Sequence, residues 1–64
     1  MKVSEVIKLL ESNGWQLVRF KGSHRQFQHP AQKGTVTVAG HLNEELHKAT
    51  WNSIQKQAGL KGKS

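Results

Sequence analysis

Cysteine is absent from this 64-residue sequence, which excludes a disulfide framework and any metal site built from thiolates. No apolar run approaches the roughly 20 residues that a membrane-spanning helix requires. The first residues begin an amphipathic pattern, in contrast to the apolar core of a signal peptide. We therefore expect no membrane association and a cytoplasmic location.

Acidic residues are scarce, with four against ten lysines and arginines, so that the formal net charge is +6. None lies between Glu11 and Glu44. That stretch carries four cations, at Arg19, Lys21, Arg25 and Lys33. Clustered cations favour a polyanionic partner, because they release counterions when they meet phosphates. The alternative is a solvated basic face that serves only solubility.

The short chain limits the kind of site that the protein can form. A domain of this size buries only about 60% of the surface that its unfolded chain exposes, which leaves little room for an enclosed pocket. We expect residues 1–60 to form a single domain that is monomeric when free, with residues 61–64 as a flexible basic tail. Any site should then lie on an open face or at a loop.

Two segments have the apolar spacing of amphipathic helices. The first begins at Val3 and runs over about residues 3–13, with Ser4 as a candidate N-cap and Gly14 as a left-handed terminator.

The second covers residues 49–58 and is expected to bury Trp51, Ile54 and Ala58. Gly59 closes it, and Leu60 is placed to fold back in a capping contact.

Three β-prone segments lie between the helices, over residues 15–21, 24–29 and 35–38. They are joined by a turn at Gly22 and Ser23 and by a five-residue connection, 30–34. The apolar positions change parity between Leu17 and Val18, which indicates either a β-bulge or a strand covered on both sides at one end.

The order of these elements predicts an α+β fold, an α-β-β-β-α two-layer sandwich with both helices on one face of a three-stranded antiparallel sheet. If Phe27, Val36 and Val38 point towards the helices, strict alternation places polar side chains on the opposite, open face. Those side chains belong to His24, Gln26, Gln28, Thr35 and Thr37.

The Gly22-Ser23-His24 turn, flanked by Lys21 and Arg25, is the best candidate for chemistry on a phosphate. An imidazole can take a proton from a ribose 2′-hydroxyl or give one to a leaving oxygen near neutral pH. Neighbouring cations stabilise the charge on the phosphate, so that neither a metal nor another cofactor is needed. Glycine allows close backbone approach, and the serine is placed to bond the phosphate or the backbone.

We therefore predict His24 as the catalytic residue. The predicted substrate-binding residues are Arg19, Lys21, Gly22, Ser23 and Arg25. A lone surface histidine beside a turn is usually inert, so two other functions stay open. One is a non-catalytic RNA-binding module that uses the same basic face, and the other is a protein-interaction domain whose charge serves only its partner.

The remaining histidines are weaker candidates for acid/base catalysis or metal binding. His41 lies in a loop and is either a second acid/base group or a loop and capping residue. His29 follows His24 by an odd number of positions, which places the two on opposite sides of a regular strand and argues against a shared metal. His47 is expected to be a solvated surface residue.

Taken together, these motifs resemble the HicA toxins, also called the YcfA-like family, which are small mRNA interferases of bacterial and archaeal toxin–antitoxin modules. The resemblance covers nearly the whole chain. It is carried by the run Leu9-Leu10-Glu11-Ser12-Asn13-Gly14-Trp15, the turn Lys21-Gly22-Ser23-His24, Phe27, His29-Pro30, Thr35-Val36-Thr37-Val38, His41 and Gln57-Ala58-Gly59-Leu60.

The resemblance implies a fold similar to the double-stranded-RNA-binding domain and a toxin of a type II toxin–antitoxin system. It further implies ribosome-independent cleavage of mRNA with His24 as the catalytic residue, and neutralisation by a HicB-like antitoxin. The chain departs from the family pattern at Ala39, where proline is usual, and at Lys48-Ala49-Thr50-Trp51, where a Pro-Gly-Thr-Leu-like run is usual.

Overall fold

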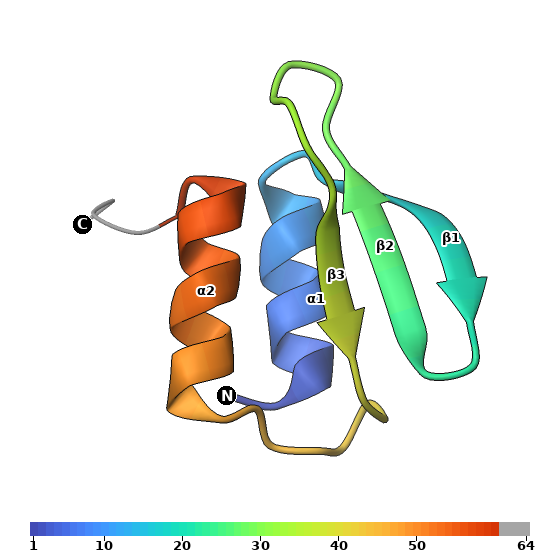
Figure 1. Ribbon diagram of the computed structural model, residues 1–64, viewed down its shortest axis with the longest axis vertical. Helices are drawn as coiled ribbons and strands as arrows, with labels where there is room; N and C mark the ends of the chain where they lie inside the picture. Colours follow the sequence, from blue (N-terminus) through green and yellow to red (C-terminus); the bar gives the residue numbers. More distant parts are fainter. Residues whose placement is uncertain (61–64) are drawn as a thin grey trace.

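The computed structural model describes residues 1–60, so the tail predicted at residues 61–64 lies outside the described residues. The elements follow in the order α1 (Val3–Ser12), β1 (Gln16–Lys21), β2 (His24–Gln28), β3 (Val36–Ala39) and α2 (Lys48–Ala58). The helices lie side by side against one face of the sheet (Figure 1). The predicted α+β fold, similar to the double-stranded-RNA-binding domain, is confirmed.

The sheet is antiparallel throughout, with β2 in the centre between β1 and β3. Lys21 pairs with His24 across a two-residue turn. Gly22 has a φ of 59° and Ser23 does not have a positive φ, which is the pattern of a type II′ hairpin turn. The pairing register shifts between Leu17 and Arg19, which confirms the predicted bulge.

The core lies between the helices and the sheet. Phe27, Val36 and Val38 point towards the helices and are buried, as predicted. They pack with residues from α1, from α2 and from the position just before β1, namely Val3, Val6, Leu10, Trp15, Ile54 and Ala58. Trp51 packs against this core but is only half-buried, less than predicted, at a shallow groove between the helices that Leu9 and Leu60 also line.

The start of α1 differs from the prediction that Ser4 caps it. The helix begins before Ser4, with Lys2 at the N-cap position, and the N–H of Lys2 donates to Oε1 of Glu5 at 2.8 Å. The N–H of Ser4 donates to the carbonyl of Leu42 at 3.1 Å. The loop before α2 thus supplies an acceptor that an isolated helix would need from a capping side chain.

The end of α2 follows the prediction. Gly59 has a φ of 70°, and the N–H of Leu60 donates to the carbonyl of Gln55 at 2.8 Å, which is the bonding of a Schellman motif. Leu60 packs against the core, so the predicted capping contact is confirmed. His47 is exposed at the N-cap of this helix, as expected.

Within residues 1–60, no helix has the length and apolar character needed to span a bilayer.

Candidate active site

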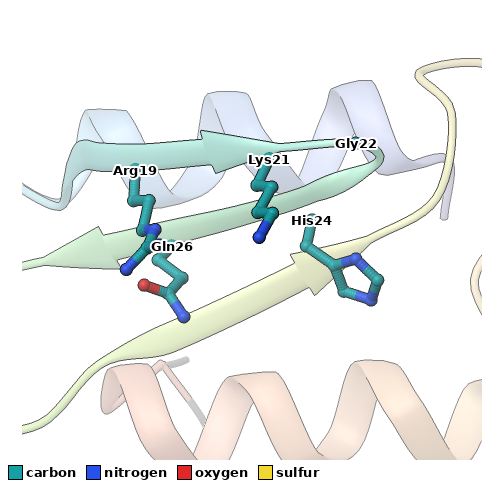
Figure 2. A pocket seen from close by; sticks show the side chains of 5 residues that line it. All are labelled: Arg19, Lys21, Gly22, His24 and Gln26. Carbon is teal, nitrogen blue, oxygen red and sulfur yellow. The ribbon is translucent and has the colours of Figure 1, made fainter.

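The register of the hairpin sets four polar side chains on the open face of the sheet. His24 pairs with Lys21, and Gln26 pairs with Arg19. Directly paired residues of antiparallel strands point to the same face. Since Phe27 faces the helices, all four side chains lie on the opposite face, as Figure 2 shows.

These side chains surround an open depression of about 500 Å³, lined by Arg19, Lys21, Gly22, His24 and Gln26. The lining combines two cations, one imidazole and one amide, and it includes no carboxylate. A phosphate placed there meets positive charge from β1 and a proton-transfer group from β2.

The ring of His24 is exposed and takes part in none of the side-chain hydrogen bonds found within residues 1–60. Both of its ring nitrogens are therefore open to a substrate. Because side chains alternate along β2, the side chain of His24 points to the face opposite Phe27. The tight turn at Gly22 leaves the space beside the His24 ring open.

His29 is engaged in a different way. Its Nδ1 accepts the N–H of Ala31 at 2.9 Å, so the ring proton lies on Nε2, which donates to the carbonyl of Asn13 at 3.0 Å. Its ring also packs edge-on against Trp15, with centroids 5.3 Å apart. His29 therefore connects the loop after β2 to the turn after α1, and it does not line the depression.

Arg25 does not line the depression. It pairs with Val38, which is buried on the helix side, so Arg25 points away from His24. Its Nη1 donates to the carbonyl of Gly40 at 2.8 Å, and its guanidinium carbon lies 4.7 Å from the ring centroid of Phe20. The structure thus places Arg19 and Lys21 beside His24 and leaves Arg25 on the other face.

Ser23 and His41 lie near the same end of the sheet without lining the depression. The carbonyl of Ser23 accepts the N–H of Gly40 at 3.0 Å, which holds the end of β3 against the turn. His41 follows directly, is exposed, and donates its backbone N–H to Oε1 of Glu44 at 3.1 Å.

Gln26 also lines the depression, although it is not one of the site residues predicted from the sequence. The signal was available, because Gln26 lies two positions after His24 on one strand and so shares its face. The same rule places Arg25, one position after His24, on the other face.

The sequence comparison places the whole described fold within one family. A family model described as the HicA toxin of bacterial toxin–antitoxin matches residues 3–60. The chain belongs to the HicA toxin family. Its site turn, core and both helices lie inside the match.

A solved structure agrees with this assignment. A chain of the structure described as "HicA3 and HicB3 toxin-antitoxin complex" is 31% identical, with a TM-score of 0.80, and the alignment covers 95% of this chain and 97% of that chain. No curated protein matches. The resemblance to HicA toxins inferred from the sequence is confirmed, and the chain is a toxin of a toxin–antitoxin system.

In the part of this HicA toxin that the structure describes, the site cations Arg19 and Lys21 form no ion pair. Within residues 1–60, the ion pair observed joins the amino terminus of Met1 to Oε2 of Glu45 at 2.6 Å, and neither residue lines the depression. This contact lowers the pKa of Glu45, first through the hydrogen bond from the amino terminus and then through its charge. In the same residues, no three metal-ligating side chains of the His, Cys, Asp or Glu type gather.

Proposed function

We propose that this HicA toxin is an endoribonuclease that cleaves mRNA without a metal, with His24 as the general acid/base. The observation that supports this most directly is the open depression itself, where an imidazole lies beside two cations, and within residues 1–60 these three side chains form neither a hydrogen bond nor an ion pair. We further propose that the functional unit is the single domain formed by residues 1–60, acting as a monomer in the cytoplasm when it is free of a partner.

In the proposed reaction, neutral His24 takes the proton of a ribose 2′-hydroxyl. The 2′-oxygen forms a bond to the adjacent phosphorus, the bond from phosphorus to the 5′-oxygen breaks, and a 2′,3′-cyclic phosphate and a 5′-hydroxyl result. The 5′-oxygen takes a proton from an imidazolium or from water, and His41 is the proposed second group. General acid/base catalysis of this kind contributes about 10²–10⁴-fold to the rate.

The other site residues have separate proposed roles. Arg19 and Lys21 stabilise the negative charge that builds up on the phosphate oxygens. The Gly22 turn lets the RNA backbone approach, and the amide of Gln26 hydrogen-bonds a ribose or base. Arg25 and Ser23 act from outside the depression, because both hold the Gly40 backbone and thereby position the turn.

We propose that a HicB-like antitoxin binds this toxin and inhibits its RNA cleavage. The support comes from the similar HicA3 chain, which is described in a complex with HicB3. The unpaired cations of the depression favour an acidic partner on physical grounds.

The test compares purified wild-type toxin with His24→Ala in cleavage of a labelled single-stranded mRNA fragment. His47→Ala is the matched control, since it removes another exposed histidine, which lies at the N-cap of α2 and does not line the depression. We expect His24→Ala to lose at least about 100-fold in cleavage rate, with a folding free energy within about 0.5 kcal/mol of wild type, as for other surface changes.

Full cleavage by a folded His24→Ala protein would contradict the catalytic assignment, and inhibition of the wild type by EDTA would contradict the metal-free mechanism. Wild-type protein that binds the RNA but never cuts it would indicate the non-catalytic RNA-binding module instead.

A further inference from the structure

The outer strand β1 exposes a run of apolar side chains. Leu17 is 48% exposed, Val18 52% and Phe20 58%. We refer to these three residues as the β1 apolar strip. Exposed apolar residues gathered on one element commonly mark an interaction site, since isolated ones are normal but a contiguous patch is unfavourable in water.

The strip is exposed because the helices do not reach it. Leu17 pairs with buried Phe27, so its side chain points to the helix side of the sheet. Both helices contact β3, at the other end of the strand order β1-β2-β3, whereas β1 pairs with β2 and forms the outer edge (Figure 1). About half of the surface of Leu17 and of Phe20 is therefore exposed.

The same strand carries the cations of the depression on its other face. Arg19 and Lys21 point to the open side with His24, while Leu17 and Phe20 point to the helix side. A partner that binds at the β1 edge therefore meets an apolar surface on one side and, on the other, two cations that form no ion pair within residues 1–60. No other strand of the described sheet combines an open edge with both features.

The charges and side-chain types decide which occupant fits. A second copy pairing edge to edge would bring Arg19 and Lys21 of both molecules together, and each chain carries a net charge of +6. The bulge at Val18 also interrupts the regular ladder that such pairing needs. RNA bases stack on aromatic rings, but two of the three side chains are aliphatic, and the Arg25 guanidinium already lies over the ring of Phe20.

We propose that the β1 apolar strip anchors an acidic partner protein, the HicB-like antitoxin, whose apolar side chains pack on Leu17, Val18 and Phe20. This inference rests on the proposed toxin–antitoxin function. Carboxylates of the bound antitoxin reach round the strand edge to Arg19 and Lys21, and so cover the depression. The anchor itself is separate from the residues that act on RNA, so antitoxin binding and RNA cleavage can be uncoupled by substitution.

The test uses a purified HicB-like antitoxin that inhibits RNA cleavage by the wild-type toxin. The double variant Leu17→Ser/Val18→Ser is compared with Leu42→Ser, whose side chain is 49% exposed on the loop before α2. We expect both variants to cleave RNA as the wild type does. The double variant should need on the order of tenfold more antitoxin for half-inhibition, and the control should need no more than the wild type.

A matched pair tests the charge of the partner. Leu17→Glu and Leu17→Lys introduce side chains of similar length and opposite charge, and the glutamate should weaken inhibition more than the lysine because the partner is acidic. Equal inhibition of the wild type and the double variant would overturn the inference while leaving the proposed function intact. Failure of every HicB-like antitoxin to inhibit the wild type would overturn both. Loss in the double variant of self-association or of binding to anionic lipid vesicles, with inhibition unchanged, would assign the strip to that other occupant.

Discussion

Removing one cation from the depression beside His24 should change how steeply RNA affinity falls with salt. The structure separates two arginines that lie close in sequence. Arg19 lines the depression, whereas Arg25 points to the other face and bonds the carbonyl of Gly40. If RNA lies over the depression, only Arg19 and Lys21 release counterions there.

The magnitude follows from the number of phosphate contacts. Each contact with single-stranded RNA contributes about 0.7 to the slope of log affinity against log salt. Two contacts give a slope of about 1.4, so a fourfold rise in salt weakens binding about sevenfold. Lys21→Ala should leave one contact and reduce that loss to about 2.6-fold.

The assay is fluorescence anisotropy with a short labelled RNA, in a His24→Ala background that cannot cut the probe, over a salt series from roughly 50 to 200 mM. Arg25→Gln is the matched control, because glutamine removes the charge but keeps an N–H donor in the side chain. We expect the control to keep the slope of its parent. If Arg25→Gln flattened the slope as much as Lys21→Ala, the separation of the two faces would be wrong.

Two further predictions concern stability. Gly14→Ala should destabilise the fold by about 2–3 kcal/mol, since the residue has a φ of 91° and its added Cβ would lie 2.7 Å from Nε2 of His29, disturbing that ring's hydrogen bond. In Gly22→Ala the added Cβ meets open space at a φ of 59°, so the free energy of unfolding should fall only by the backbone strain of about 1–2 kcal/mol. Urea unfolding measures both variants, and equal decreases in the free energy of unfolding would show that the His29 contact is unimportant. The lowered pKa of Glu45 stabilises the fold above the carboxyl's ordinary value of 4.5, and this contribution disappears as the pH falls through the lowered pKa. Thermal melts should therefore give the wild type a slightly higher Tm than Glu45→Gln near neutral pH, and this difference should vanish in acid. A difference in Tm that grew in acid would refute the assignment.

Much of the site follows from local pattern alone. The parity change at Leu17 and Val18 predicts the bulge as one of two alternatives, and the turn at Gly22 fixes Lys21 opposite His24. Alternation along β2 then places His24 on the face opposite Phe27. These features depend on side-chain periodicity and turn geometry, which are properties of neighbouring residues.

Other features needed the folded chain. Ser4 has the chemistry of an N-cap, but the loop carbonyl of Leu42 reaches its N–H only after the chain has folded. Trp51 lies on the apolar face of α2, yet it is half-buried because the groove between the helices stays open at that point. In both cases a partner distant in sequence decides the outcome.

The sequence by itself determined the elements, the hairpin register and the face that carries His24. Only the tertiary structure decided that the helices pack over β3 and leave β1 uncovered, that Arg25 holds Gly40, and that His29 locks the α1 turn to the loop after β2. The spacing of apolar residues in the sequence indicates which side of a helix or strand is apolar. Whether that side is buried depends on which other element lies against it, and the packing of the whole chain determines which elements are in contact.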